Sequence, residues 1–285
     1  MAIIQKILQA VDNWQLKHQA IGFIYAVFKK YSQDQVGYQA VLLTYYGFLS
    51  LFPLFLILTT VLGVVANDHP QLRETVTHGI TTYFPILGGQ LSTHIQTLHK
   101  SGLALIIGIL FMLYGARGVA GAFRHGVNHI WQTEEQAKLG FLPSLAKNMA
   151  IILVGGLGFI LASLISGYAS AVGRGLVFHS LSIGLDLIIF YGLFLFLINI
   201  SLPSQISLSE IRVGAATAAL GLVVLQSLGG YLLAHELRTL DALYSSFAIV
   251  LGLLFWIYLQ VQVLYLAIEI AVVRSRHLWP RSFLQ

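Results

Sequence analysis

The residues of this chain that could do chemistry are polar side chains set inside long apolar stretches. In the last such stretch, 245–273, Glu269 is the only charged residue. Tyr258, Gln262, Tyr265 and Glu269 recur there at steps of four, three and four residues, so a helix would place them on one face. Inside a membrane, a polar stripe is expected to face protein or water and not lipid. The spacing therefore predicts either a buried polar path or a row of hydrogen bonds between helices.

Other polar residues lie inside or beside further apolar stretches. Asp186 would cost about 2.5–3.5 kcal/mol if it lay unpaired at the centre of a bilayer, so we expect it to pair with Arg117 or Arg174. The hydroxyl residues around Thr44 precede Pro53, which is expected to kink its helix because it lacks a backbone donor. These hydroxyls either line a cavity or satisfy backbone groups freed by the kink. The candidate intramembrane polar or cavity residues are Thr44, Tyr45, Pro53, Arg117, Asn128, Asp186, Gln226, Tyr258, Gln262 and Glu269.

Motifs for metal or nucleophilic chemistry are weak in this chain. His125 and His129 have the i,i+4 spacing of a chelating pair, but no Glu follows His125 as a zinc-protease motif needs. Interfacial hydrogen bonding is therefore the better interpretation. Ser144 and Lys147 fit a Ser-x-x-Lys spacing without its companion motifs. Cysteine is absent, which excludes a thiol nucleophile. We predict no cofactor, no bound metal and no enzymatic activity.

Composition places these residues in a membrane protein. The chain of 285 residues is 57% hydrophobic and 9% charged, whereas soluble domains carry about 25% charged residues. Several apolar runs are long enough to cross the roughly 30 Å hydrocarbon core of a bilayer. We therefore predict an all-α fold, a polytopic bundle of six transmembrane helices with amphipathic interfacial helices, in a single domain over 1–285. The spans are expected at about 40–66, 102–119, 145–170, 181–200, 211–234 and 245–273.

Small residues predict where these helices approach one another closely. Gly115, Gly118 and Gly121 recur every three residues, and the span at 211–234 is rich in Gly and Ala. Both patterns are typical of helices that pack inside a bundle.

The remaining segments flank the spans. Residues 1–38 are predicted to be cytoplasmic and amphipathic, either lying on the membrane surface or packed on the cytoplasmic end of the bundle. Residues 67–101 are predicted to form an outer-face elbow, re-entrant or surface-lying, and 274–285 a cytoplasmic tail. No removable signal peptide is predicted, and the first span is expected to remain as an uncleaved anchor.

The placement of Lys and Arg predicts the orientation. With six spans and the N-terminus inside, twelve of the 16 basic residues fall in inner segments and four in outer ones. Because Lys and Arg favour the cytoplasmic side, both termini are predicted to be cytoplasmic.

Three segments carry a combined pattern that points to a known family. They read TYYGFLSLFPLFLI (44–57), GARGVAGAFRHGVNHIW (115–131) and DALYSSFAIVLGLLFWIYLQVQVLYLAIEIA (241–271). They resemble the signature regions of the YihY/BrkB family of bacterial inner-membrane proteins, with Arg117, Asn128 and Glu269 among the matches. Ile268 departs from the small Ala that the family usually has there. The resemblance covers about 20–273 and implies six spans in an inner membrane. It implies little about activity, although names attached to the family include virulence factor and ribonuclease BN.

Two functions are left open by these observations. A metal-dependent nuclease needs clustered acidic and His ligands, whereas the 11 acidic residues here are scattered and no basic surface is interleaved with aromatic residues. Ribonuclease activity and a nucleic-acid partner are therefore not predicted. The leading hypothesis is a translocator or permease-like protein for an unidentified lipid or amphipathic substrate, with membrane lipids as partners. The alternative is a non-transporting envelope scaffold whose polar residues only join helices. Both allow a homo-oligomer or an envelope protein partner.

Overall fold

The computed structural model describes residues 19–65, 102–133, 140–172, 176–238 and 245–279, and the regular structure in these ranges is helical throughout. The all-α prediction is confirmed for this part of the chain. Predictions for 1–18, for the elbow at 67–101 and for 280–285 lie outside the described residues. The helices are α2 (Gln19–Gln33), α3 (Val36–Val65), α6 (Gly102–Ile130), α8 (Phe141–Val172), α9 (Leu176–Ser201), α10 (Leu208–Arg238) and α11 (Ser245–Ser275).

Four helical segments in the described part are long and apolar enough to cross a membrane. They are Phe141–Ala162, Ser180–Ser201, Leu208–Gly229 and Val250–Ser275. These segments coincide with the last four predicted spans. The first two predicted spans fall in α3 and α6, which are not among the four, so a count of six crossings stays a prediction.

Several helix boundaries differ from the sequence-based prediction, those of α8 and α3 among them. α8 begins at Phe141, four residues earlier than predicted, and includes Pro143 in its first turn. A proline is tolerated there because the first turn of a helix has no partner for its backbone N–H groups. α3 begins at Val36 and continues as one helix through Pro53.

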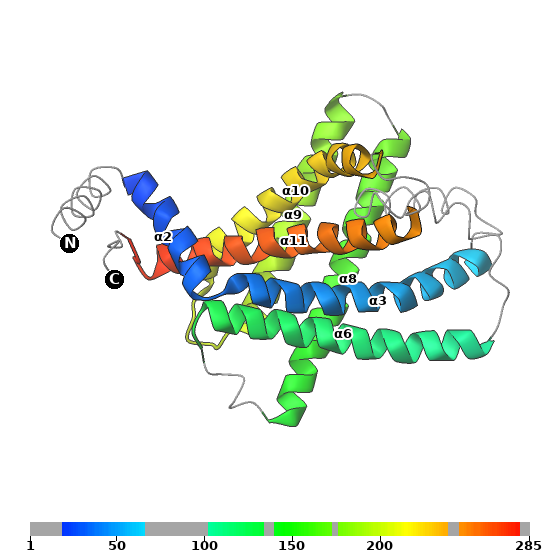
Figure 1. The fold of residues 1–285 in the computed structure, drawn as a ribbon, viewed down its shortest axis with the longest axis horizontal. Coiled ribbons are helices and arrows are strands. Elements are labelled where there is room, and N and C mark those ends of the chain that lie inside the picture. Colours follow the sequence, from blue (N-terminus) through cyan, green and yellow to red (C-terminus); the bar gives the residue numbers. More distant parts are fainter. Residues whose placement is uncertain (1–18, 66–101, 134–139, 173–175, 239–244, 280–285) are drawn as a thin grey trace.

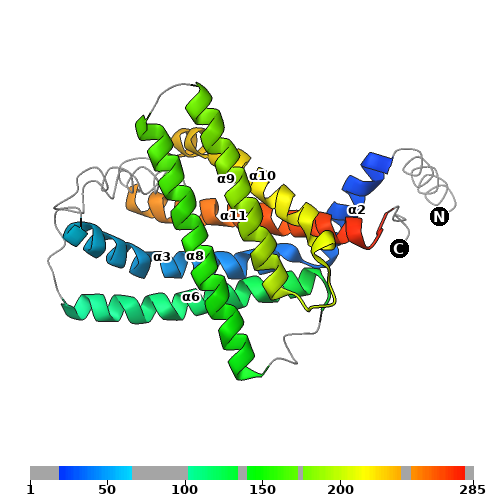
Figure 2. The same ribbon diagram turned by 180° about the vertical axis from the view of Figure 1, so that it is seen from behind.

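The helices form two groups that cross at a steep angle. α3, α6 and α11 run side by side along the long axis of the molecule, while α8 and α9 form a pair that crosses them (Figures 1 and 2). α10 packs against both α9 and α11. Gly214 permits this packing, because a Cβ added to it would lie 2.9 Å from the Cβ of Ala271. The small residues of α10 thus allow close packing as predicted, but the helix is not interior, because Leu220 and Val224 on another face are exposed.

The apolar side chains divide between the bundle interior and an outward face. Trp256, Phe190 and Ala218 are buried in one continuous core. By contrast, α8 exposes Leu153 and Leu157 by 63% and 59%. Large exposed apolar side chains on a helix of this composition are what a lipid-facing surface requires.

Helix α2 packs on one end of the bundle. Its residues Ala26 and Val27 are buried with Val273 of α11 in a small separate core cluster, while Ile24 and Phe28 point outward. For α2, packing on the end of the bundle is thus observed, whereas the arrangement predicted for 1–18 stays a prediction. The exposed apolar side chains leave its outer face suited to a membrane surface.

Helix α10 begins with a capping box, which gives a first prediction. The Ser207 hydroxyl and backbone N–H both donate to the Glu210 carboxylate, at 3.0 and 2.7 Å. We expect Ser207→Ala to lower the free energy of unfolding by about 1 kcal/mol, because it removes one of these two bonds. Thermal unfolding in detergent would measure this change. Ser204→Ala, an exposed neighbour in the same loop, is the control, and an equal loss for both variants would contradict the prediction.

Candidate functional site

The polar stripe of α11 faces protein, as predicted. Tyr265 and Glu269 are completely buried, and Tyr258 and Gln262 are half-buried. The Tyr31 hydroxyl of α2 donates to the Gln262 side-chain oxygen, and the Tyr265 hydroxyl donates to the Ala122 carbonyl of α6 at 3.4 Å. The stripe is therefore the surface on which α2 and α6 meet α11.

A buried cation lies at the end of this stripe. The Lys30 ammonium of α2 lies 2.9 Å from the Glu269 carboxylate and also pairs with Asp34. It donates a further hydrogen bond of 2.8 Å to the Ile130 carbonyl. The Lys30 and Glu269 side chains are 3% and 0% exposed. We call Lys30, Asp34 and Glu269 the ion cluster.

Local backbone structure explains how the ion cluster is assembled. α2 ends at Gln33, and Gln35 adopts a positive φ of 49° that turns the chain into α3. This turn leaves Asp34 four residues after Lys30, within reach of its ammonium. The Ile130 carbonyl is available because the last carbonyls of a helix have no partner within that helix. Its position at the C-terminus of α6 also favours a neighbouring positive charge.

Neighbouring polar groups hold the ion cluster in place. A ring nitrogen of His129 lies 2.8 Å from the Asp34 carbonyl, which confirms the interpretation of His129 as an interfacial hydrogen-bonding residue. The Gln132 amide donates to the Asp34 carboxylate at 3.4 Å. Burial raises the pKa of the Tyr31 hydroxyl above its ordinary value, so Tyr31 remains a donor to Gln262 at neutral pH.

The charges of the ion cluster do not balance. One ammonium faces two carboxylates and a carbonyl at the end of a helix. Burying a charge is costly unless it is paired and hydrogen-bonded. The Lys30 ammonium donates to the Asp34 carboxylate and to the Ile130 carbonyl. Both oxygens of Glu269 lack a hydrogen-bond donor among the described residues, although the ammonium lies close enough for ion pairing, and the acidic side carries a formal surplus. The arrangement can therefore accept a proton or a cationic group with little rearrangement.

Three further polar links tie helices together at the same end of the molecule. Asn128 donates to the Ser201 carbonyl at the end of α9, at 2.8 Å. Arg124 is 3% exposed and donates to Asn148 of α8 at 2.9 Å. The guanidinium of Arg276 lies over the Trp131 ring and donates to the carbonyl of that residue at 2.8 Å. This end of the bundle is therefore joined by side-chain bonds between α6, α8, α9 and the end of α11.

Other predicted site residues lie far from this end. A rise of 1.5 Å per residue places Asp186 about 22 Å along α9 from Ser201, and Arg117 about 20 Å along α6 from Ile130. By the same measure, Gln226 lies about 24 Å along α10 from Glu210. Asp186 is buried and Arg117 is exposed, and no ion pair joins them among the described residues.

The hydroxyls of Thr44 and Ser50 bond carbonyls of their own helix, but neither is the Leu49 carbonyl that Pro53 leaves without its donor, so both predicted roles stay predictions. The Thr44 hydroxyl donates to the Ala40 carbonyl and the Ser50 hydroxyl to the Gly47 carbonyl, both at 2.7 Å within α3. Tyr45 is 55% exposed. These hydroxyls thus bond within their own helix.

The sequence analysis did not identify Lys30, Asp34 or Arg124 as site residues. A signal for Lys30 was present, since it lies three and four residues after Val27 and Ala26 on the buried side of α2. A cation on the apolar face of an amphipathic helix needs a buried partner. Its partner is 239 residues away in the sequence, and no local pattern identifies it.

Metal ligands do not gather in the described residues, where no group of three His, Cys, Asp or Glu side chains could hold an ion. The rings of His125 and His129 stack with centroids 6.3 Å apart.

Comparison with known proteins gives the family. Residues 27–282 match the family described as Virulence factor BrkB. A UPF0761 membrane protein of Psychrobacter sp. (strain PRwf-1) is 22% identical over 298 residues, which cover 98% of this chain and 53% of that protein. The chain thus spans about half the length of this curated relative. No solved structure matches the chain. With a match over most of its length and four helices of membrane-spanning character, the chain belongs to the BrkB virulence factor family.

Proposed function

We propose that this protein is a permease-like translocator of the bacterial inner membrane, with six spans and both termini in the cytoplasm. Its substrate is amphipathic and lipid-like, and the protein is not an enzyme. The observation that carries the proposal is the buried ion pair between Lys30 and Glu269. This pair joins α2, which is not among the spanning segments, to the span at Val250–Ser275.

The position of the ion pair suits a gate. Glu269 lies about 9 Å from the end of α11, at a rise of 1.5 Å per residue. A charged group at that depth is rare in membrane helices and marks a functional site by default. When α2 moves outward, the Lys30 ammonium leaves Glu269. A cationic headgroup or a proton can then take the place of the ammonium at the Glu269 carboxylate. Ion pairing would then couple the position of α2 to occupation of the stripe.

The surroundings of the ion pair support an amphipathic substrate. Above Glu269, the stripe continues through Tyr265, Gln262 and Tyr258, so polar and aromatic groups alternate along one face of α11. The exposed apolar side chains of α8 keep membrane lipid in contact with the bundle. A substrate with one polar end could therefore follow the stripe while its apolar part stayed in lipid.

Flux through reconstituted protein tests the proposal. Liposomes containing the full chain and a labelled phospholipid should show transbilayer movement above that of protein-free liposomes. We expect Glu269→Gln to lower this flux about tenfold, which corresponds to about 1.4 kcal/mol of lost stabilisation on the pathway. Arg212→Gln is the control, because Arg212 is an exposed cation on α10 outside the stripe and the ion cluster. Equal fluxes for wild type and Glu269→Gln would exclude a role of Glu269 in the path.

The second candidate is a non-transporting envelope scaffold. It is favoured by the position of Lys30 on α2, whose ammonium contacts Glu269 of α11 and the Ile130 carbonyl of α6 and so joins three helices. The pocket at this end of the molecule is also not lined by Tyr258, Gln262 or Glu269. A scaffold would show no phospholipid movement above protein-free liposomes, and its Glu269→Gln variant would lose only stability.

A further inference from the structure

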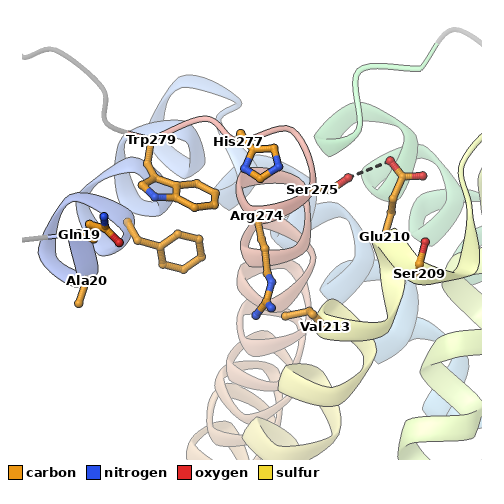
Figure 3. A pocket seen from close by; sticks show the side chains of 10 residues that line it. Gln19, Ala20, Ser209, Glu210, Val213, Arg274, Ser275, His277 and Trp279 are labelled. Atoms are coloured by element: carbon orange, nitrogen blue, oxygen red, sulfur yellow. Dashed lines mark hydrogen bonds between the residues drawn. The ribbon is translucent and has the colours of Figure 1, made fainter. Parts of the chain in front are cut away.

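An open pocket of about 670 Å³ lies at the end of the bundle, between the start of α2, the start of α10 and the end of α11. Figure 3 shows its wall, with Trp279 and His277 at the end of α11, Gln19 and Ala20 on α2, and Ser209 and Val213 on α10. None of the ion cluster residues lines it. The volume falls in the range of about 300–1,000 Å³ that small-molecule sites occupy.

The end of α11 folds back to make the aromatic part of this wall. His277 has a positive φ of 50°, and the Leu278 N–H donates to the Val273 carbonyl at 3.0 Å. This is the αL turn that commonly ends a helix. It directs Trp279 onto Phe23 of α2, with ring centroids 5.2 Å apart and planes at 86°. Trp is enriched where one part of a site meets apolar groups and another meets water.

The two charged groups of the pocket differ in whether they already have hydrogen-bond partners within the protein. The Glu210 carboxylate is bound by Ser207 on one oxygen and by Ser275 on the other, the latter at 2.8 Å. The Arg274 side chain is exposed, and its guanidinium has no hydrogen bond or ion pair with any described residue. Figure 3 shows its side chain extending from α11 towards Val213 of α10. The available charge in the pocket is therefore positive.

An apolar strip leads away from the pocket along α10. Val213, which lines the pocket, is followed by Leu220 and Val224 at steps of seven and four residues, so the three share one helix face. Leu220 and Val224 are 55% and 49% exposed. Because this segment of α10 is a candidate span, the strip runs from the pocket into the depth of the bilayer.

We propose that this pocket binds one anionic phospholipid. The Arg274 guanidinium binds the phosphate, Trp279 lies at the level of the glycerol esters, and an acyl chain follows Val213, Leu220 and Val224. A guanidinium binds phosphate with two parallel hydrogen bonds. An anionic head group, with its net negative charge, is a stronger partner for this cation than a zwitterionic head group. The site is separate from the ion cluster and does not depend on transport.

Lipid binding to the purified full chain tests this inference. Native mass spectrometry in detergent would compare phosphatidylglycerol with phosphatidylethanolamine of identical acyl chains. We expect a preference for phosphatidylglycerol in the wild type and about a tenfold loss of its affinity in Arg274→Gln. Arg274→Lys, which keeps the charge, should lose about threefold or less. Arg212→Gln removes an exposed cation of α10 outside the pocket and should change the affinity less than twofold.

The outcomes separate the lipid from other ligands and from the proposed transport. Equal losses in Arg274→Gln and Arg212→Gln would overturn the site, because any cation at this end would then serve. Displacement of phosphatidylglycerol by an equal concentration of inorganic phosphate would overturn the lipid as ligand and assign a soluble anion. An unfolding temperature within about 2 °C of the wild type shows that a variant is folded. If Arg274→Gln is not folded by this criterion, the affinity of Arg274→Lys decides the case. Absence of phospholipid flux with intact binding would count against the translocator alone.

Discussion

Lys30→Met is expected to lower the free energy of unfolding by about 3–5 kcal/mol, the largest effect of any single change proposed for this chain. The substitution keeps the apolar stem but removes the ammonium that pairs with Glu269 and Asp34. Glu269 is completely buried, so its charge would then lie unpaired in an apolar environment. Unfolding in mixed detergent micelles, followed by tryptophan fluorescence, would measure the loss.

The neighbouring lysine provides a matched control for this variant. Lys29 is half-buried, and its ammonium lies 5.8 Å from the centre of the Tyr25 ring. Lys29→Met should therefore cost about 1 kcal/mol or less. Adding Glu269→Met to Lys30→Met should recover most of the stability, because apolar groups of similar volume often replace a buried ion pair without loss. Additive losses in the double variant would show that the two side chains are not coupled.

Gly118→Ala and Gly121→Ala are expected to change stability in opposite directions. A Cβ on Gly118 would lie 2.3 Å from the Cδ1 atom of the Tyr46 ring, so the ring or the helix must move. Such overpacking costs about 1–3 kcal/mol. A Cβ on Gly121 meets no atom within 4 Å, so Ala should stabilise α6 there by up to about 1 kcal/mol through its helix propensity. Thermal unfolding of the two variants measures both effects.

A compensating change identifies the cause of the Gly118 effect. Tyr46→Ala alone should cost stability, since Tyr46 packs against the main core. In the double variant with Gly118→Ala, the total loss of stability should be smaller than the sum of the two single losses. The reason is that Tyr46→Ala removes the ring with which the new Cβ would clash. The prediction fails if Gly118→Ala is as well tolerated as Gly121→Ala.

Sequence patterns predicted those features of the fold that depend on local periodicity. The last span was predicted at 245–273 and α11 ends at Ser275. The spacing of Tyr258, Gln262 and Glu269 was sufficient to predict a face turned away from lipid, because it places three polar side chains on one side of an apolar helix. Gly118 was correctly predicted as a position of close approach, whereas Gly121 was wrong, since a repeat of three residues does not show which of its members meets the neighbouring helix.

Contacts between distant segments were beyond the reach of these patterns. The partner of Glu269 is Lys30, which was counted only as one of many inner basic residues. Asp186 was expected to pair with Arg117 or Arg174. No ion pair joins it to Arg117 among the described residues, and Arg174 lies outside them, so the pairing with Arg174 stays a prediction. The composition of a span indicates that its charge needs a partner, while the packing of the helices decides which residue supplies it.

Cross-linking between α2 and α11 tests the central claim, that α2 closes over the polar stripe of the last span. The chain contains no cysteine, so Tyr31→Cys and Gln262→Cys introduce the only two thiols. In native membranes, a short bifunctional thiol reagent should join them, because the parent side chains are hydrogen-bonded. The pair Tyr31→Cys and Leu251→Cys is the control, since Leu251 lies about 16 Å further along α11. Linked peptides from the first pair and none from the second, detected by mass spectrometry, are the predicted result. Linkage of the control pair alone, or of neither pair, would contradict the account.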